Sequence, residues 1–204
     1  MLGCKEFYDK TAARWAQNGY TEEAEPVCMD EFCALLPSGG RVLDLCCGAG
    51  YVSFRLRRRG FEPVGLDLSE ESLSIAREKN PGVPFYQGNM LESYPQVGAV
   101  DGIICIAGLV HVETADLPLA FRRMGEVLKP GGYLLASVRY GTGRMEERSV
   151  AEIDGELYDR NFIAHNEEEL TAAAGESFVL VREMPSDMKI WAYYLFQKNE
   201  ENPL

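Results

Sequence analysis

The feature that most limits how this chain can fold is a glycine turn placed between two apolar runs. The first run, Val42–Leu45, leads into a turn with Gly48 and Gly50, and a second run ends at Asp67, about 20 residues further on. The stretch between them, Tyr51–Arg59, has the spacing of an amphipathic helix. This order is typical of a βαβ nucleoside-binding unit, in which glycines let the backbone approach the ligand and the acid accepts both ribose hydroxyls. The sequence therefore predicts a cofactor that contains adenosine.

Two residues near the turn indicate which cofactor this is. A dinucleotide-binding loop needs a third glycine where this chain has Ser53. Asp44, shortly before the turn, would repel a pyrophosphate, whereas its carboxylate can pair with the cationic amino group of a methionine moiety. Asp44 therefore favours S-adenosylmethionine over NAD. An NAD-linked oxidoreductase remains the weaker alternative, supported by Gly48, Gly50 and Asp67 alone.

The same segment resembles the first motif of the class I S-adenosylmethionine-dependent methyltransferases, in particular the small single-domain bacterial members of the type 11 and type 25 groups. The motif of that family reads acid-x-Gly-x-Gly-x-Gly and corresponds here to Asp44–Gly50. Cys46 stands where the family has its first glycine. Asp67 with Leu68 is similar to the ribose-binding acid and its neighbour in that family.

Further segments extend the resemblance over nearly the whole chain. Asn89 replaces the acid that faces the adenine amino group in the family, yet its amide oxygen can accept the same hydrogen bond. The segments that carry the resemblance are Tyr8–Trp15 for the helix that closes over the cofactor, Gly88–Met90 for the turn after the third strand, Asp101–Val112 for the fourth motif, and Lys129–Val138 for the KPGG turn and the fifth strand.

The resemblance implies S-adenosylmethionine as cofactor, with S-adenosylhomocysteine as its product, and no metal. It also implies the residues that bind the cofactor. They are Tyr8, Trp15, Asp44, Leu45, Cys46, Gly48, Gly50, Tyr51, Asp67, Leu68, Asn89, Met90, Ile106, Ala107 and His111.

Strand-like and helix-like segments alternate along the chain, which predicts an α/β fold: a Rossmann-like three-layer αβα sandwich. The sheet is expected to have seven strands, mostly parallel, with the antiparallel C-terminal edge hairpin that the family implies. Strands are predicted at Arg41–Cys46, Pro63–Asp67, Pro84–Gln87, Gly102–Ile106, Tyr133–Val138, Phe178–Glu183 and Lys189–Gln197. Helices are predicted at Cys4–Asn18, Pro26–Leu36, Tyr51–Arg59, Glu70–Lys79 and Leu117–Leu128, with a last helix from the cap Asn166 to about Ala174.

Length and composition predict one domain over residues 1–204, and the resemblance implies that it is a class I methyltransferase domain. A chain of 204 residues with 46% hydrophobic residues can build one sizeable core. Residues 1–36 are expected to form the helices that close over the cofactor. Residues 140–165 form a polar, glycine-containing insert that is long enough for a lid on the acceptor side, although an exposed β-turn region has the same composition.

The net charge of −12 argues against a nucleic-acid partner, because lysine and arginine contacts to phosphates supply most of that affinity. The basic cluster Arg55–Arg59 is interpreted as a helix end before Gly60. No apolar run reaches the ~18 residues that span a bilayer, and the N-terminus lacks the apolar segment of a signal peptide. We therefore expect no membrane contact and a cytoplasmic protein. The six cysteines contain no CxxC pair and are interpreted as buried thiols.

Methyl transfer depends mainly on positioning, because the sulfonium charge already activates the methyl carbon. Groups that face the acceptor should come from the ends of the fourth and fifth strands, the N-terminal helix and the insert after the fifth strand. This selects His111, Glu113, Tyr8, Trp15, Arg139 and Tyr140, together with residues 141–165. His111 is the candidate catalytic base, but we favour the alternative that it packs beside the cofactor without moving protons. His165 is interpreted as a surface residue.

An acidic domain without a recognition module favours a small-molecule acceptor, and oxygen, nitrogen, sulfur and carbon acceptors all fit. A monomer and a homodimer both fit as well. A protein that binds S-adenosylmethionine without transferase activity is the remaining alternative, since binding motifs do not prove turnover.

Overall fold

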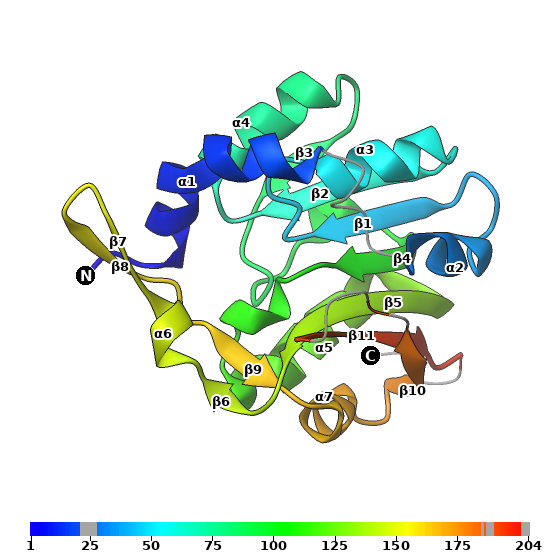
Figure 1. Ribbon diagram of the computed structural model, residues 1–204. Coiled ribbons are helices and arrows are strands. Elements are labelled where there is room, and N and C mark those ends of the chain that lie inside the picture. Colours follow the sequence, from blue (N-terminus) through cyan, green and yellow to red (C-terminus); the bar gives the residue numbers. More distant parts are fainter. Residues whose placement is uncertain (21–27, 185, 187–189, 201–204) are drawn as a thin grey trace.

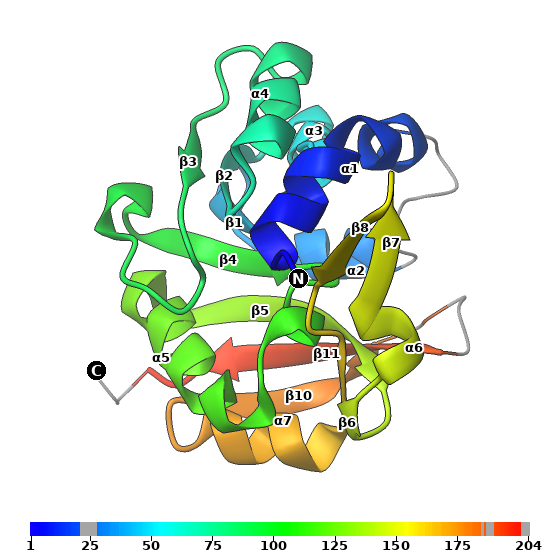
Figure 2. The same cartoon turned by 90° about the vertical axis from the view of Figure 1, so that its left-hand side faces the viewer.

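The computed structural model describes residues 1–20, 28–184, 186 and 190–200. A mixed β-sheet lies in the middle of the molecule, with helices on both faces (Figures 1 and 2). This arrangement confirms the predicted three-layer αβα fold.

Seven strands form the main path of the sheet, in the order β10-β11-β5-β4-β1-β2-β3. The strands β1 to β5 run parallel to one another, whereas β11 is antiparallel to both β5 and β10. Since parallel strands connected through helices all end at the same edge, the segments after β1, β2 and β4 meet there. The bounds are Arg41–Leu45 for β1, Glu62–Asp67 for β2, Phe85–Gln87 for β3, Val100–Cys105 for β4, Leu128–Tyr140 for β5, Phe178–Met184 for β10 and Trp191–Lys198 for β11.

Six of the seven predicted strands agree with these bounds to within two residues. The fifth strand begins at Leu128, earlier than the predicted Tyr133. Its pairing with β4 is irregular, since Val100 pairs with Leu128 while Gly102 pairs with Tyr133. The KPGG segment is thus a bulge within the strand, a geometry that Gly131 allows with its φ of +73°. Lys189 of the last predicted strand lies outside the described residues.

Six described helices lie close to their predicted positions: α1 (Cys4–Gly19), α2 (Met29–Ala34), α3 (Tyr51–Arg58), α4 (Glu70–Lys79), α5 (Leu117–Val127) and α7 (Glu167–Ala174). The sequence did not predict α6 (Glu146–Ser149) or the short 3₁₀ helices η2 (Pro95–Val97), η3 (Leu109–His111) and η4 (Thr114–Asp116). The helix predicted at Pro26–Leu36 is shorter in its described part, and residues 26 and 27 lie outside that part. Asn166 caps α7 with the predicted capping box, since Glu169 returns a hydrogen bond to the cap. None of the described helices combines the length and the apolar character needed to cross a bilayer.

The prediction of seven strands was incomplete, because the insert after β5 contributes four more. β9 (Ile163–His165) pairs with the end of β5, and β6 (Gly143–Arg144) pairs with β9, which gives the main sheet nine strands. The strands β7 (Val150–Ile153) and β8 (Glu156–Asp159) form a separate hairpin. Strands of two to four residues are too short to show a hydrophobic period, which explains why the sequence pattern did not predict them.

The core lies on both faces of the sheet. On one face, Phe32 of α2 and Leu56 of α3 pack against strand residues such as Leu135. On the other face, Phe121 of α5 and Leu170 of α7 pack in a second buried cluster. With both faces covered, the carboxyl edge of the sheet is the place left for a ligand.

Candidate cofactor and acceptor site

The predicted cofactor residues gather at the carboxyl edge of the sheet. Asp44 pairs with Gly65 of β2 and with Ile104 of β4, so the glycine turn after β1 lies between the ends of those two strands. The strands are buried along their length, whereas residues at this edge are partly exposed. The partly exposed residues here are Cys46, Gly48, Asp67, Asn89, Ile106, Ala107 and His111.

Asp67 stands beside the turn and is bound to it. Its Oδ2 accepts a hydrogen bond from the Gly48 N–H at 2.8 Å, and its Oδ1 accepts one from the Ser69 N–H at 2.9 Å. Burial raises the pKa of Asp67, against the opposing effect of these backbone donors. A Cβ atom on Gly48 would meet no other atom within 4 Å, so the turn faces open space. A carboxylate with spare lone pairs next to open space fits a ribose with two hydroxyl donors.

Asp44 connects β1 to the start of α3. Its Oδ2 accepts hydrogen bonds from the Ser53 backbone N–H at 2.9 Å and from the Ser53 hydroxyl at 2.7 Å. The residue is only 2% exposed, and burial raises the pKa of its carboxyl to about 7. In this structure Asp44 thus fixes the helix that follows the turn. Its pairing with the amino group of the cofactor stays a prediction.

The backbone of Cys46 adopts the left-handed conformation. Its φ is +60°, a value that ordinarily favours glycine, and Ala107 at the end of β4 has a φ of +56°. Cys46 therefore keeps the backbone geometry for which the family motif has glycine, at a cost of about 1 kcal/mol. The substitution changes the side chain that faces the site and leaves the path of the turn intact.

The residues expected near adenine follow β3. Asn89 Oδ1 accepts a hydrogen bond from the Leu91 N–H at 3.0 Å, which leaves the oxygen one further lone pair for an adenine amino group. Met90 is buried, and its Sδ lies 3.8 Å from Cys46 Sγ. The side chain of Met90 thus packs beneath the turn, so a contact with the cofactor would come from its backbone.

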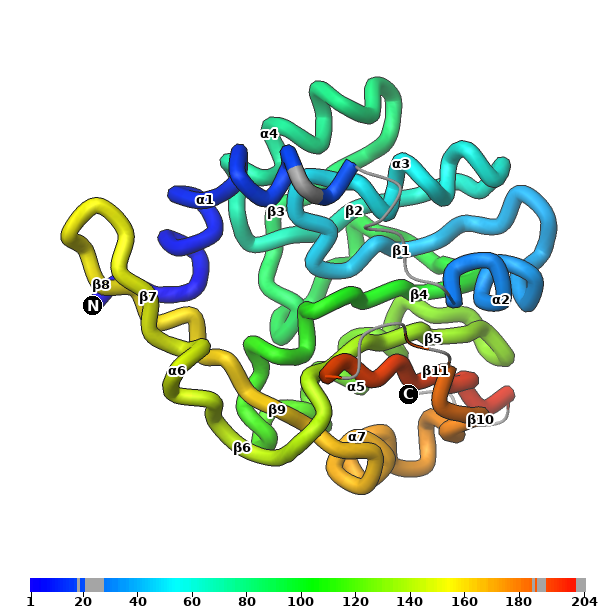
Figure 3. The backbone as a smooth tube through the Cα atoms, in the orientation of Figure 1, coloured from blue at the N-terminus to red at the C-terminus, as the bar shows by residue number. Residues whose placement is uncertain are grey.

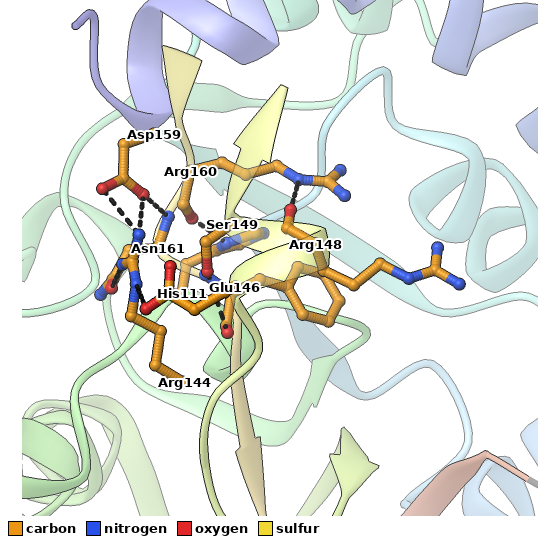
Figure 4. Close-up of polar contacts among 9 residues, drawn as sticks. His111, Arg144, Glu146, Arg148, Ser149, Asp159, Arg160 and Asn161 are labelled. Carbon is orange, nitrogen blue, oxygen red and sulfur yellow. Dashed lines mark hydrogen bonds and ion pairs between the residues drawn. The ribbon is translucent and has the colours of Figure 1, made fainter. Parts of the chain in front are cut away.

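His111 connects three segments that are far apart in the sequence. Its Nδ1 lies 2.7 Å from the carbonyl oxygen of Arg160, and because a carbonyl only accepts, Nδ1 carries the proton. Nε2 therefore accepts the hydrogen bond from the Tyr8 hydroxyl, at 2.8 Å. Burial lowers the pKa of His111 to about 4, so the ring is neutral at neutral pH. Figure 4 shows His111 next to the polar residues of the insert.

The N-terminal segment with α1 packs against the hairpin β7–β8, and we call the two together the α1–hairpin unit. Leu2 makes two backbone hydrogen bonds with the hairpin, at 2.9 and 2.7 Å. The ring of Phe7 lies edge-on to Tyr158, with 6.1 Å between the ring centres. Figure 3 shows the two segments side by side. The predicted closing helix is thus held by the insert, as one structural unit.

Two residues of the insert complete this unit and were not predicted from the sequence. The Arg160 guanidinium lies 4.9 Å from the ring centre of Phe7 and 5.1 Å from that of Phe162. The ring of Phe162 in turn lies edge-on to His111 at 5.6 Å. No motif marks Arg160 or Phe162, because their role depends on contacts with residues far away in the chain.

The chain connecting β8 to β9 is fixed by a second polar group. Arg144 donates to both carboxylate oxygens of Asp159, at 2.9 and 2.8 Å, and to Asn161 Oδ1 at 2.7 Å (Figure 4). These contacts hold residues 159–161, and within this segment the Arg160 carbonyl accepts a hydrogen bond from His111 Nδ1. The insert is therefore an ordered part of the site.

The interpretation of His165 as a surface residue was wrong. His165 is fully buried in β9, and its Nε2 lies 3.1 Å from the Leu109 carbonyl and 3.2 Å from the Val112 carbonyl. These two carbonyls flank His111, so His165 fixes the loop that carries the other histidine. The pairing of β9 with the end of β5 brings His165 inside, a contact that the local sequence does not indicate.

The other predicted residues differ in how closely they approach the site. Trp15 is 43% exposed on α1, with 6.4 Å between its ring centre and that of Tyr8. At the end of β5, Arg139 lies over the ring of Trp191 at 6.0 Å, whereas Tyr140 is 67% exposed. The exposed Glu113, the exposed Leu68, the buried Leu45 and the partly buried Tyr51 have no contact that defines a role here.

The arginine cluster on α3 makes contacts within the protein, which supports its structural interpretation. Arg55 is buried and donates to the Gly19 carbonyl at 3.0 Å, joining α3 to the end of α1. Arg59 pairs with Asp30 at 2.7 Å, and Arg57 donates to the Pro81 carbonyl.

Residues 42–132 match the family model of the methyltransferase domain. The Bacillus subtilis protein YqeM is 43% identical over 110 residues, which cover 52% of this chain and 44% of that protein. The malonyl-[acyl-carrier protein] O-methyltransferase of Serratia marcescens is 32% identical over 127 residues, covering 61% of this chain and 49% of that enzyme. The chain thus spans about half the length of these relatives.

Solved structures have the same fold at low sequence identity. The PH0226 protein of Pyrococcus horikoshii has a TM-score of 0.71 at 22% identity, covering 92% of this chain and 99% of that one. CalS10 of Micromonospora echinaspora, an amino pentose methyltransferase with S-adenosylmethionine bound, has a TM-score of 0.66 at 18% identity, covering 94% of this chain and 92% of that one. Residues 42–132 therefore match a methyltransferase domain, and the solved structures share the fold over most of this chain.

Proposed function

We propose that the protein transfers a methyl group from S-adenosylmethionine to a small-molecule acceptor. The observation that carries this proposal is the position of Asp67 beside a glycine turn that faces open space, at the carboxyl edge of a parallel sheet. The bound cofactor would supply a methyl carbon made electrophilic by the sulfonium charge. The residues of this chain then have to hold the two reactants in line and keep water away.

The cofactor residues divide into groups by the part of the ligand that they would bind. Asp67 would accept the ribose hydroxyls, and Asn89 the adenine amino group. The N-terminus of α3, which the Asp44–Ser53 hydrogen bond holds, would face the methionine moiety. Helix N-termini and their neighbouring acids bind charged groups. Trp15 on the α1–hairpin unit would cover the ligand. The remaining predicted contacts are Tyr8, Leu45, Cys46, Gly48, Gly50, Tyr51, Leu68, Met90, Ile106, Ala107 and His111.

His111 would act by positioning and not as a base. Its one acceptor atom, Nε2, already receives the Tyr8 hydroxyl proton, and its pKa of about 4 makes it a weak proton acceptor at neutral pH. A neutral imidazole with fixed donor and acceptor atoms holds Tyr8 and the insert at the edge of the site. This supports the cofactor-contact interpretation over the catalytic one.

A small-molecule acceptor suits a site at this sheet edge, which the α1–hairpin unit adjoins through the Tyr8–His111 hydrogen bond. The names of two of the proteins above specify an acceptor, malonyl-[acyl-carrier protein] in one and an amino pentose in the other. The net charge of −12 disfavours a nucleic acid. The single domain, the monomeric or homodimeric state and the cytoplasmic location expected from the sequence stay predictions.

Calorimetric titration with S-adenosylmethionine, S-adenosylhomocysteine and NAD tests the cofactor. We expect heat of binding from the first two ligands and none from NAD. A panel of small acids, amines, phenols and thiols, followed by detection of S-adenosylhomocysteine, then tests turnover. Binding without product on any acceptor class would favour a binding protein, and absence of binding would reject the proposal.

A further inference from the structure

We propose that Cys46 and Cys105 form a thiol modification site at the cofactor turn, which a peroxide converts to a disulfide. Cys46 is the first residue after β1, and Cys105 is the last residue of β4, the neighbouring parallel strand. The inference concerns a property beyond methyl transfer, and the effect on cofactor affinity described below rests on the proposed function.

The two sulfur atoms converge on one point. A Cβ atom on Gly108 would lie 2.6 Å from Cys105 Sγ and 2.8 Å from Cys46 Sγ, so both thiols border the space that this glycine leaves empty. The register of β1 and β4 offsets Cys46 from Cys105 by one residue, and strands about 4.8 Å apart then bring the two Cα atoms near the roughly 4.4–6.8 Å that a disulfide needs. Met90 Sδ lies 3.8 Å from Cys46 Sγ, so Cys46 has two sulfur neighbours, Met90 and Cys105. A disulfide would require a shift of the turn toward β4.

The two cysteines differ in exposure. Cys46 as a residue is partly exposed at the edge of the sheet, whereas Cys105 is fully buried. A hydrogen bond to the Cys105 thiol and burial raise the pKa of Cys46 well above its usual range. Since the thiolate is the reactive form, the oxidation is slow at neutral pH and becomes faster as pH rises.

The chemistry needs only the peroxide as co-reactant. The Cys46 thiolate attacks one peroxide oxygen, the O–O bond breaks, and a sulfenic acid and hydroxide result. The Cys105 thiolate then attacks the Cys46 sulfur, the S–S bond forms, and the sulfenic oxygen leaves as hydroxide. The two hydroxides take up the two protons that the thiols lost on ionisation. The two thiols lose two electrons together, and one peroxide is reduced to two waters.

The disulfide would disturb the part of the turn that binds the cofactor. Gly48 lies two residues after Cys46, and its N–H donates to Asp67 at 2.8 Å. A hydrogen bond of that length weakens steeply when the donor moves by about 1 Å. We therefore expect oxidation to weaken S-adenosylhomocysteine binding at least tenfold, with recovery after reduction by dithiothreitol.

The experiment treats the folded full-length protein with hydrogen peroxide at pH 7 and pH 9 and maps disulfides by peptide mass spectrometry under non-reducing conditions. The expected result is a Cys46–Cys105 linkage that forms faster at pH 9. Cys46→Gly and Cys105→Ala should each abolish it, and glycine suits the φ of +60° at position 46. Cys47→Ala serves as the matched control, because this adjacent buried cysteine contacts Gly65 and Phe85 on the opposite side.

Calorimetry with S-adenosylhomocysteine before and after peroxide gives the second measurement. Wild type and Cys47→Ala should lose affinity for S-adenosylhomocysteine on oxidation. In Cys46→Gly and Cys105→Ala, the oxidised and reduced proteins should bind it with nearly equal affinity. Peroxide treatment that yields no Cys46–Cys105 linkage, or an equal loss of affinity in Cys46→Gly, would overturn the inference. If the reduced protein binds no S-adenosylhomocysteine while the linkage still forms, the proposed function fails and the modification site stands.

Discussion

The two sides of the site are assembled in different ways. The cofactor side is built from residues 41–90, in which the predicted contact residues lie mainly at or just after the ends of strands, as Asp67 ends β2. The other side is assembled around His111, whose partners Tyr8 and Arg160 lie 103 and 49 residues away in the sequence. The comparison teaches that short local motifs can mark the side predicted to bind the cofactor, whereas the side around His111 depends on contacts between distant segments.

The largest expected effect tests whether the cofactor side depends on one local acid. Asp67→Ala removes the acceptor for the ribose hydroxyls and for the Gly48 N–H, and it should weaken S-adenosylhomocysteine binding by ~2–3 kcal/mol. Calorimetric titration measures this change. Asp101→Ala is the matched control, because Asp101 also accepts a backbone N–H, from Arg41, but at the opposite edge of the sheet. An unchanged affinity in Asp67→Ala would remove the ribose assignment.

The next prediction uses pH to isolate the contacts of His111. The pKa of this residue is about 4 in the folded protein and 6.5 ordinarily, so the unfolded state binds the extra proton between these values. Stability from the neutral ring is therefore complete above pH 6.5 and is lost as pH falls toward 4. We expect wild type to lose about 1–2 kcal/mol more than His111→Gln between pH 7 and pH 4.5, measured by urea unfolding.

Other groups also titrate between pH 7 and pH 4.5. Comparing wild type with His111→Gln removes their contribution to the change in unfolding free energy. The pKa of Asp44 is raised to about 7, so its burial destabilises the fold as pH rises, which is the opposite sign. His165→Gln gives a second reference for the other buried histidine. If wild type and His111→Gln lose the same stability on acidification, the neutral His111 network does not hold the α1–hairpin unit.

A change at the N-terminal cap of α7 should affect stability alone. Asn166→Ala removes the cap of α7 and should cost about 1 kcal/mol of unfolding free energy, with cofactor affinity unaltered. Asn166→Ser, which keeps a capping oxygen, should restore most of the loss. A drop in affinity for S-adenosylhomocysteine in the alanine variant would show that α7 is coupled to the site.

The smallest effect concerns the turn itself. Cys46→Gly relieves the left-handed strain at φ +60° and should raise the unfolding free energy by about 0.5 kcal/mol, because the lost packing against Met90 offsets part of the gain. Cys46→Ala, which keeps the strain and loses the sulfur, should be destabilised. Thermal unfolding of the reduced proteins compares the two, and equal stabilities would mean that the backbone conformation at this position carries no cost.

The sequence by itself determined the layout of the fold and the cofactor side of the site. Alternating apolar periods, the capping box at Asn166 and the glycine turn before Asp67 are properties of a few consecutive residues, and they predicted the helices, the seven strands of the main path and the fold class. The acid at position 44 also indicated the cofactor, although its hydrogen bonds to Ser53 became visible only in the structure.

The tertiary structure alone decided how the acceptor side is made. It placed Arg160 and Phe162 against His111, buried His165 behind the same loop, and added the short strands of the insert to the sheet. It also brought the Cys46 and Cys105 thiols to one point. The physical reason is that such contacts join segments separated by tens of residues, and their burial and hydrogen bonds depend on the packing of the whole chain, on which local periodicity gives no information.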